Sequence, residues 1–400
     1  MPDTKNSSTS FVTPSSRKAG LQRTHSSQDE VISIFHSSHN MQNPQLRCNI
    51  KTSSWTIPVL IMSFLFLIIT PASGDAIYSK QKVRLMAVGD IQLGSGTATQ
   101  INRYGSPWVF EKVLPIFRQA DFIVGNLESP LSTHNEPAQK RWVFRGDPKM
   151  ARELRISGFN ALSVANNHAF DHGQTALADT LKHLANAQLI AVGGGFGTEQ
   201  PYKAKIVEIN GIKIALIGAQ NIGWYPVADS KAGIAMIDEK KLVGEIKEVR
   251  KSVDFIVIIL HWGVEYTQTP TDKQRQLAHY LIDSGADLIF GHHPHIIQGI
   301  EHYKNGFIAY SLGNFVFNND NDLACRTIIL SIDLNPNGTL SNLMVAPISI
   351  RNFRPEPNYT PDGEKTLGIL TECGKKLGAN GITRFHWIPL AEYISSTNMR

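Results

Sequence analysis

Cysteine is scarce in this sequence, and no two cysteines stand at the spacing of a thiolate metal site. The 400 residues include only Cys48, Cys325 and Cys373, with no CxxC pair, which argues against zinc binding of the finger type. If the mature chain begins after residue 74, Cys325 and Cys373 remain. A disulfide between them and two free thiols are then both consistent with the sequence.

A strong excess of charge is also lacking. The chain carries 39 Lys and Arg against 34 Asp and Glu, and residues 1–74 hold six of the former and three of the latter. Residues 75–400 are therefore close to balance, with 33 basic against 31 acidic side chains. This balance gives no support to binding through bulk charge, so we expect no nucleic-acid partner.

The first 54 residues have few apolar clusters and are rich in Ser, Thr, Asn and Gln. Such a segment cannot bury enough apolar surface to offset its ordering entropy, and we predict a disordered extension over residues 1–54. Met41 would begin a signal peptide of ordinary length. Residues 1–40 are therefore a candidate extension of the gene model.

The chain has one long apolar run, residues 55–69 (WTIPVLIMSFLFLII), preceded by Arg47 and Lys51 and followed by small residues up to Gly74. This order is typical of a secretory signal, and the run falls short of the roughly 20 residues needed to span a bilayer. We predict a signal peptide over residues 55–74, with an uncleaved membrane anchor as the alternative. The protein is then exported, and is periplasmic, extracellular or anchored at the outer membrane face.

Beyond residue 76, short β-branched runs alternate with segments of helical period, as in layered α/β folds. We predict one domain over residues 82–351 and an irregular extension over residues 352–400. Asn210-Gly211 predicts the turn of a hairpin spanning residues 205–217. Helices are expected at residues 108–117, 175–187, 239–251 and 271–284, and further strands at 307–310 and 327–334.

Five short apolar runs each lead into side chains that commonly bind metals. The runs cover residues 83–88, 121–124, 160–164, 255–260 and 287–290. Sites in open α/β sheets form beyond the carboxyl ends of the strands, so residues distant in sequence are expected to meet there. The side chains that follow these runs are Asp90, Glu128, Asn167, His168, His261, His293 and His295.

Each of these positions also has an ordinary structural alternative. Asp90 could cap a turn, Glu128 could be solvated, and His261 could be a hydrogen-bonded core histidine. His293 and His295 favour the metal interpretation most, because they alternate around a proline and both imidazoles can face one ion. His292 is then expected to point away from the ion and to pack or hydrogen-bond behind the ligands.

The segment ANNHAFDHG, residues 165–173, places His168, Asp171 and His172 directly after a buried strand. Turn chemistry explains its Asn and Gly residues but not three titratable side chains. We interpret Asn167 as an oxygen ligand of a metal and His168 as an acid that binds no metal. Asp171 would orient the loop.

Two further residues are candidates for substrate binding. Arg145 ends the basic segment RWVFR and has the forked geometry that binds an anion through two hydrogen bonds, although a solvated surface is the alternative there. Asn314 ends the segment YSLGN, which leads off another strand end toward the same crevice.

The ordered set GD, GNLE, ANNHAFDHG, HWG-x-EY, GHHPH and YSLGNF resembles the CapA family of poly-γ-glutamate capsule biosynthesis proteins, over about residues 82–351. That family is similar to calcineurin-like metallophosphoesterases, which implies a four-layer α-β-β-α sandwich. The resemblance implies that Asp90 and His295 hold a first metal and that Glu128 bridges two metals. Asn167, His261 and His293 would complete the second, and His168 would take the place of the phosphoesterase acid.

The sequence departs from the phosphoesterase pattern at Gln92, where a histidine is usual, and at Glu128, where an aspartate is usual. The first metal therefore loses a nitrogen ligand. One or two divalent ions are expected, and a shell of carboxylate, amide and imidazole groups suits Mn²⁺, Fe or Zn²⁺ better than Ca²⁺.

Three functions fit these observations. The first is a metal-dependent hydrolase or transferase with a bridging-water nucleophile, which acts on a phosphoester or an anionic envelope polymer such as poly-γ-glutamate alongside polymer-synthesis proteins. The second is a non-catalytic, metal-stabilised component of a polymer export machine, which the Gln92 substitution favours. The third is a secreted phosphatase or nucleotidase, with Trp142, Phe144, Trp224 and Tyr225 as candidates for a base clamp.

Overall fold

The computed structural model describes residues 80–223, 225, 230–317 and 321–389. The chain divides into two units, Met1–Ala72 and Ser73–Arg400, and all described residues belong to the second. The predicted disordered extension, the predicted signal peptide, Cys48 and Trp224 lie outside the described residues. Within these ranges, no helix is both long enough and apolar enough to cross a membrane.

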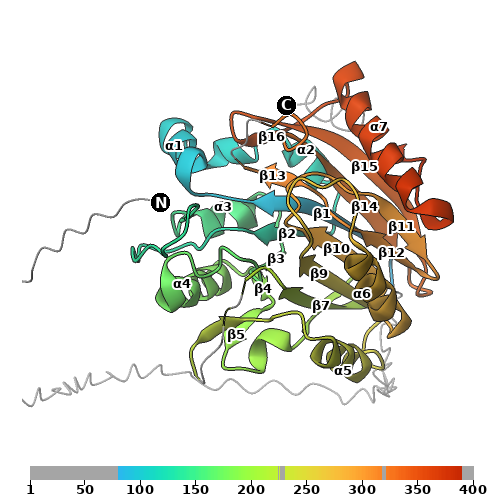
Figure 1. Ribbon diagram of the computed structural model, residues 1–400, viewed down its shortest axis with the longest axis horizontal. Helices are drawn as coiled ribbons and strands as arrows, with labels where there is room; N and C mark the ends of the chain where they lie inside the picture. Colours follow the sequence, from blue (N-terminus) through green and yellow to red (C-terminus); the bar gives the residue numbers. More distant parts are fainter. Residues whose placement is uncertain (1–79, 224, 226–229, 318–320, 390–400) are drawn as a thin grey trace, which may run out of the picture. The chain divides into compact units, whose positions relative to one another are not determined.

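The larger of two central sheets has the strand order β16-β15-β14-β1-β2-β3-β4, with β13 paired to β1 and β17 paired to β15 (Figure 1). Strands β1, β2, β3 and β4 are parallel, so their carboxyl ends share one edge. The strands are β1 (Val83–Ile91), β2 (Phe122–Leu127), β3 (Ala161–Ser163), β4 (Ile190–Val192), β13 (Asn314–Val316), β14 (Arg326–Leu334), β15 (Leu340–Arg351), β16 (Arg354–Pro357) and β17 (His386–Trp387).

The smaller central sheet has the order β11-β12-β10-β9-β7-β6. Asn210 and Gly211 have positive φ angles of 51° and 79° at the turn between β6 and β7, which confirms the predicted hairpin. A separate two-stranded sheet pairs β5 (Gly194–Phe196) with β8 (Ala232–Ile234). The strands of the smaller central sheet are β6 (Lys205–Ile209), β7 (Ile212–Gln220), β9 (Phe255–His261), β10 (Leu288–His292), β11 (Ile300–Tyr303) and β12 (Gly306–Ala309).

Three of the four predicted helices are confirmed as α4, α5 and α6. Helix α6 begins at a capping box in which Thr271 and Gln274 bond each other's backbone N–H groups. The fourth, predicted over residues 108–117, forms only a short 3-10 turn and α2, because Pro115 has no N–H for a continuous helix. The helices are α1 (Ser95–Tyr104), η1 (Ser106–Val109), α2 (Leu114–Phe117), α3 (Met150–Ile156), α4 (Gly173–Asn186), η2 (Gln200–Tyr202), α5 (Glu239–Val249), α6 (Asp272–Asp283), α7 (Pro361–Lys376) and η3 (Gly378–Asn380).

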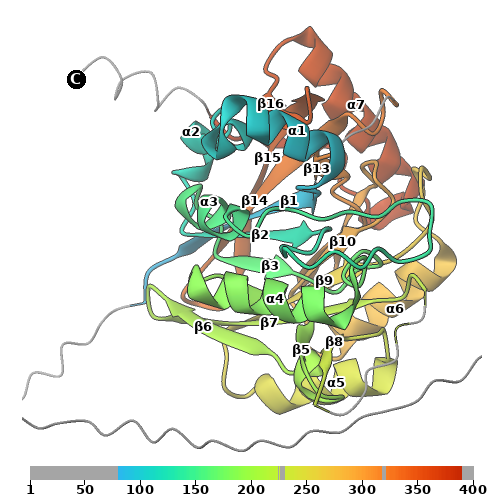
Figure 2. The same ribbon diagram turned by 90° about the vertical axis from the view of Figure 1, so that its left-hand side faces the viewer.

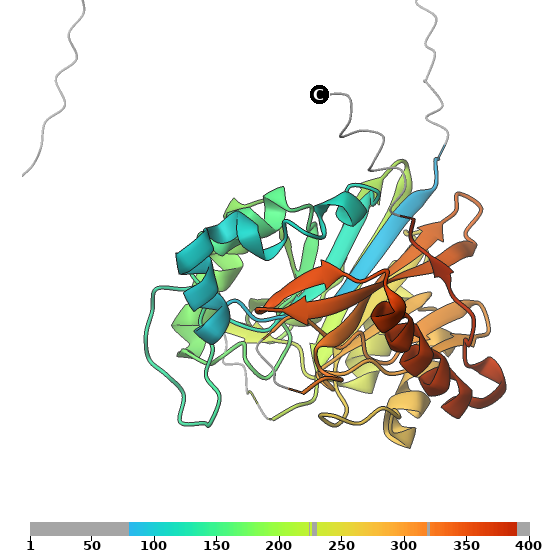
Figure 3. The same ribbon diagram turned by 90° about the horizontal axis from the view of Figure 1, so that it is seen from above.

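The buried apolar residues form three layers of core, which confirms the four-layer α-β-β-α sandwich. In β1, Leu85 and Ala87 face the smaller sheet, while Met86 and Val88 face helices α1–α4, as the two-residue period of a strand requires. A third cluster packs α5 and α6 on the outer face of the smaller sheet. Figure 2 shows the first helix layer in front of β1–β3, and Figure 3 shows the strands between the helix layers.

The expectation that residues 352–400 are irregular is wrong for the part that the structure describes. Strand β16 pairs with β15, and helix α7 buries Leu370 and Cys373 against the sandwich. Thr360 caps α7, because its side chain accepts a bond from the N–H of Asp362. Cys373 is a free thiol, so the disulfide with Cys325 does not form.

Candidate functional site

Residues from both central sheets meet at one buried cluster where five strands end. Asp90 lies at the end of β1, and His261 and His292 are the last residues of β9 and β10. Gly89 is required beside Asp90, because a side chain there would place its Cβ 1.9 Å from the carbonyl oxygen of Gly313. The segments that follow β2, β3 and β10 supply the rest of the cluster.

Asp90 is fully buried and is held by neighbours on every side. Its Oδ1 accepts a hydrogen bond from Asn126 Nδ2 at 2.9 Å and lies 3.1 Å from His292 Nδ1. Its Oδ2 lies 3.3 Å from His295 Nδ1 and accepts a bond from the His293 N–H. Burial alone would raise the pKa of Asp90, but the bonds and charges of His292 and His295 hold it well below its usual value. Asp90 is therefore ionised at neutral pH.

Glu128 is fully buried, and neither of its carboxylate oxygens has a hydrogen-bond partner. Three imidazole nitrogens face its Oε1 at distances that are too long for hydrogen bonds: His261 Nε2 at 3.7 Å, His295 Nε2 at 3.8 Å and His168 Nε2 at 3.9 Å. Burial and the charge of Asp90 raise the pKa of Glu128 well above its usual value. A buried, unpartnered carboxylate is costly unless a cation is bound beside it.

Asn167 and His261 lie in direct contact, with Asn167 Oδ1 2.7 Å from His261 Nε2. The rings of His261 and His293 are 4.9 Å apart. His293 Nδ1 is buried and has no hydrogen-bond partner. Burial and the charge of His295 lower the pKa of His293 to about 3, so His293 is neutral and able to bind a metal.

The pKa of His295 shifts in the opposite direction from the pKa of His293. Burial would lower its pKa, but the charge of Glu128 and the hydrogen bond with Asp90 outweigh burial and raise the pKa to about 9. Both His293 and His295 have positive φ angles, 92° and 59°, which residues with side chains rarely adopt. Backbone strain of this kind is concentrated at functional sites, where the surrounding structure holds it.

His168 and Asp171 form a pair beside the cluster. His168 Nδ1 is 2.7 Å from Asp171 Oδ2, which also accepts a bond from the N–H of Phe144. Lys140 Nζ contacts Asp171 Oδ1 at 2.5 Å and the Asn167 carbonyl at 2.8 Å. The ring of Phe144 stacks on His168 with centroids 4.3 Å apart. These contacts turn Nε2 of His168 toward Glu128, and burial lowers the pKa of His168.

Asn126, Asn166 and His292 belong to the site, although their sequence context indicates no role as ligands. Asn126 Nδ2 contacts both Asp90 Oδ1 and His261 Nδ1, the latter at 3.2 Å. Asn166 Nδ2 donates to Asn126 Oδ1 at 3.0 Å and so fixes its orientation. The three residues position the metal-binding candidates, as outer residues do in metal centres.

The two residues predicted to bind substrate differ in their contacts: Asn314 contacts a histidine of this cluster, and Arg145 contacts the loop that follows β2. Asn314 is fully buried, and its Oδ1 lies 2.9 Å from His295 Nδ1, so it orients that histidine. Arg145 donates to the carbonyl oxygens of Thr133 and His134 at 2.9 and 3.1 Å, in the loop that follows β2. A role for either residue in substrate binding stays a prediction.

The candidates for a base clamp are largely occupied by other contacts. Phe144 stacks on His168, and Tyr225 stacks on Phe170 while its hydroxyl donates to the Asn167 carbonyl. Trp142 is exposed, with the guanidinium of Arg141 over its ring.

The donor set fits a pair of divalent ions. Potential ligand atoms lie within 4.8 Å of one another in two groups that share Glu128: Asp90, Glu128 and His295, and Glu128, His261 and His293. These groups bring together the carboxylates and histidines of the ligand sets that the resemblance implies, and Asn167 contacts His261. Their binding of metal stays a prediction. The orphaned oxygens of Glu128 and the bare Nδ1 of His293 are accounted for if cations bind between them.

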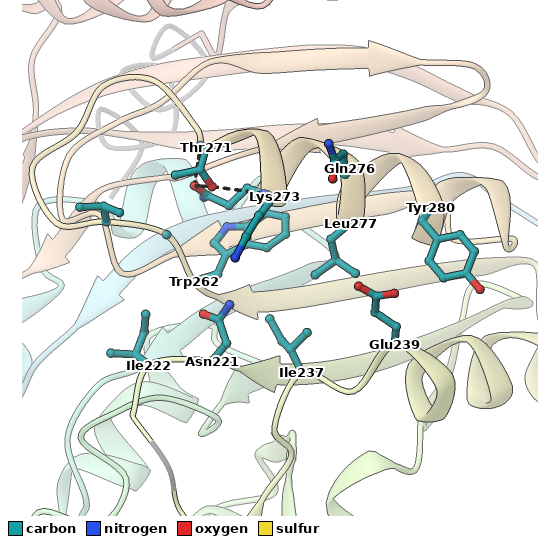
Figure 4. Close-up of a pocket in the computed structure, with 13 residues that line it drawn as sticks. Asn221, Ile222, Ile237, Glu239, Trp262, Thr271, Lys273, Gln276, Leu277 and Tyr280 are labelled. Carbon is teal, nitrogen blue, oxygen red and sulfur yellow. Dashed lines mark hydrogen bonds between the residues drawn. The ribbon is translucent and has the colours of Figure 1, made fainter.

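A cavity of about 800 Å³ lies beside this cluster, between α6 and the ends of β7 and β9 (Figure 4). Trp262, which directly follows His261, forms part of its wall. Lys273 and Thr271 lie toward one end of the cavity, and Glu239 and Tyr280 toward the other. The predicted site residues do not line it.

Comparison with known proteins gives relatives over most of the chain. The "PGA biosynthesis protein CapA" of Bacillus subtilis (strain 168) is 33% identical over 324 residues, which cover 79% of this chain and 85% of that protein. The "Capsule biosynthesis protein CapA" of Bacillus anthracis is 32% identical over 287 residues, covering 69% of this chain and 70% of that protein. A solved structure of a hypothetical protein from Thermus thermophilus is 15% identical, with a TM-score of 0.44, and covers 66% of this chain and 98% of that one.

The family assignment rests on both sequence comparisons. The model of the family described as "Bacterial capsule synthesis protein PGA_cap" matches residues 84–319, a span that contains Asp90 at one end and Asn314 at the other. The two CapA relatives agree with it. This confirms the resemblance that the ordered motifs indicate, and the chain belongs to the bacterial capsule synthesis protein family PGA_cap.

Proposed function

We propose that this chain is an exported accessory protein of capsule or poly-γ-glutamate synthesis, with a divalent-metal centre that hydrolyses or transfers an anionic substrate. The substrate is a phosphoester or an anionic envelope polymer such as poly-γ-glutamate. The names of the CapA relatives support the pathway, and polymer-synthesis proteins of the envelope are the expected partners.

The observation that carries the metal centre is Glu128. Its carboxylate is buried and has no hydrogen-bond partner, while three histidine nitrogens face it at 3.7–3.9 Å. Hydrogen-bonded side chains would approach to about 3 Å. A separation of 3.7–3.9 Å instead fits two metal–ligand bonds of about 2 Å each, with one ion between the two atoms.

Divalent ions in this position would lower the pKa of a bound water and polarise the bond that is attacked. His168 presents Nε2 to the same space, while Asp171 holds its Nδ1 and Lys140 holds Asp171. A proton on Nε2 can pass to the leaving group. Burial lowers the pKa of His168 below its ordinary 6.5. Turnover that depends on this proton should therefore decrease as the pH rises through the lowered pKa of His168.

The test compares purified wild-type protein with His293→Ala and with His302→Ala, whose histidine is exposed on β11. Metal content is measured directly, and turnover is measured with poly-γ-glutamate, an aryl phosphate and nucleotides. We expect metal-stimulated turnover of one substrate class in wild type and His302→Ala, and its loss in His293→Ala. Equal activity of the His293→Ala variant would refute the proposal.

Gln92 favours a second candidate function, a non-catalytic assembly component whose metal centre serves structure or ligand capture. Gln92 is buried, and its Oε1 accepts a bond from the Thr97 hydroxyl at 3.2 Å. Gln92 therefore does not supply a metal ligand in place of the histidine that is usual at this position. This candidate predicts metal-dependent stability and polymer binding without turnover. Hydrolysis in any arm of the substrate screen would eliminate it.

Export is tested in the source cells. We expect mass spectrometry of envelope and culture fractions to find the protein there with a new amino terminus near residue 75. Protein found only in the cytoplasm would contradict export, and an intact apolar segment in the membrane fraction would support the anchor in place of the cleaved signal.

A further inference from the structure

A carboxylate that the sequence left without a role reaches the metal-binding candidates from their open side. Glu265 follows β9 by four residues and is exposed. Its carboxylate and one ring nitrogen each of His293 and His295 all lie within 4.8 Å of one another. Asp90 and Glu128, the other carboxylates near these histidines, are fully buried. Glu265 is therefore the acidic group that meets solvent.

The loop carrying Glu265 is tied to the loop carrying the two histidines. The N–H of Tyr266 donates to the carbonyl oxygen of Pro294 at 2.9 Å, and Gln298 Nε2 donates to the carbonyl oxygen of Thr267 at 2.7 Å. Tyr266 has a positive φ of 58°, which is rare for a residue with a large side chain. The backbone directly after Glu265 is thus bonded to the HHPH segment and to Gln298, which follows it.

His293 gives an independent indication of a ligand. The residue is 5% exposed, and its Nδ1 is buried and has no hydrogen-bond partner. A bare, buried ring nitrogen is expected where a cation binds and is otherwise costly. This nitrogen belongs to a residue shared by the Glu128 group and the Glu265 group.

The spacing allows all three groups to hold one ion. Metal–ligand distances are about 2.0–2.2 Å, so two ligand atoms of one ion stand at most about 4.4 Å apart. The three ligand atoms lie within 4.8 Å of one another, which is close to that span. An exposed glutamate side chain can adjust its position by rotating about its own bonds.

We propose that Glu265 is a metal ligand, which completes from the solvent side the coordination of an ion held by His293 and His295. The proposal thus places on one ion two histidines that the resemblance assigns to different ions. The inference rests on the metal centre of the proposed function. The centre lacks the histidine ligand that is usual at the position of Gln92, and Glu265 would supply one further ligand. As the exposed ligand, it is the one that an oxygen of an anionic substrate displaces, and a third carboxylate favours a hard ion such as Mn²⁺.

The test measures Mn²⁺ binding to the purified full chain by electron paramagnetic resonance. Four forms are compared: wild type, Glu265→Gln, Glu265→Asp and Glu364→Gln, the last removing the same charge from an exposed position in α7. We expect Glu265→Gln to weaken binding of at least one ion by about 10-fold or more and to change the spectrum of bound Mn²⁺. Glu265→Asp should restore part of the affinity, and Glu364→Gln should match wild type.

The outcomes separate this inference from the proposal on which it rests. Wild-type protein that binds no divalent metal would overturn the metal centre itself. Wild-type protein that binds metal, with unchanged affinity and spectrum in Glu265→Gln, would overturn the role of Glu265 alone. Thermal unfolding without metal verifies folding, and if Glu265→Gln does not fold, the affinity of Glu265→Asp decides.

Discussion

Asn126 connects both sheets to the site, because its amide contacts Asp90 at the end of β1 and His261 at the end of β9. Removing that amide leaves two candidate ligands without a positioning group. We expect Asn126→Ala to weaken metal binding by about 10- to 100-fold and to cost about 1–3 kcal/mol of stability. Metal titration and urea unfolding measure the two effects.

The matched control for this prediction is Asn358→Ala. Asn358 is also buried and donates to Ser349 Oγ at 2.7 Å and to Asp362 Oδ2 at 3.0 Å, at the other end of the larger sheet. It should lose stability without losing metal affinity. Equal metal affinity in Asn126→Ala and wild type would contradict the positioning role.

The buried carboxylate of Glu128 should strengthen metal binding but destabilise the metal-free protein. Burial and Asp90 raise its pKa well above the usual value, so its ionised form destabilises the metal-free protein as the pH rises above about 4.5. Glu128→Gln should therefore raise the metal-free unfolding temperature at pH 7 while weakening metal binding. A lower unfolding temperature of the metal-free variant, measured by calorimetry with chelator present, would argue against this account.

At the scale of single residues, the sequence predicted the members of the cluster better than their contacts. Asp90, Glu128 and the three strand-end histidines are recognisable because ligand-type side chains follow apolar runs. Asn126 carries no such signal, because its role depends on the register that places it opposite Asp90. Glu265 was missed because it stands in an exposed loop, where a glutamate is ordinary.

Glycines at strand ends permit the close approach that forms the site. A Cβ on Gly291 would lie 2.0 Å from the carbonyl oxygen of Tyr310, whereas a Cβ on Gly244, in α5, meets nothing within 4 Å. We expect Gly291→Ala to cost about 1–3 kcal/mol and Gly244→Ala to stabilise by about 0.5–1 kcal/mol. Urea unfolding of both variants tests the contrast, and equal effects would contradict it.

The buried carboxylate of Asp333, on β14, pairs with partly exposed cations at the start of β1, and this pairing should make stability depend on pH. Burial would raise the pKa of Asp333, but bonds from Arg84, Asn342 and Lys82 outweigh burial and lower it below 3.8. A carboxyl whose folded pKa is lowered stabilises the fold above its unfolded pKa, and this contribution is lost as the pH falls through the folded value.

The prediction from this ion pair is that wild type loses more unfolding free energy than Asp333→Asn between pH 5 and pH 2. Urea unfolding across that range measures the difference. Asp147→Asn, at a half-exposed position, is the control and should follow wild type. Parallel curves for wild type and Asp333→Asn would show that the pair contributes nothing.

At the scale of elements, the continuous apolar runs of β9 and β10 were recognisable because both faces of these strands are buried. The capping signal at Thr271 located α6. The sequence could not reveal α7 as readily, because its glycines weaken the helical pattern and its stability comes from packing on the sandwich.

The whole sandwich depends on the segment that the sequence left as irregular. Helix α7 packs on β15 and β11, and Leu370 and Ile388 are fully buried. A chain that ends at Arg351 would expose that apolar surface, and each fully buried side chain contributes about 1.5–3 kcal/mol. We expect it to lose cooperative thermal unfolding and to aggregate.

A chain that ends at Pro389 is the control, since it retains every described element. Residues 75–389 should unfold at the same temperature as residues 75–400. A soluble, cooperatively folded chain ending at Arg351 would show that the domain closes at the predicted boundary.

The two central sheets each supply part of the cluster: Asp90 and Glu128 come from one, and His261, His293 and His295 from the other. An ion shared between them would be a cross-link between the two halves of the sandwich, made without a covalent bond. Because only the folded chain would bind such an ion, the melting temperature would depend on the ion concentration. In a protein whose described cysteines form no bridge with each other, ion binding would then oppose sliding of one sheet on the other.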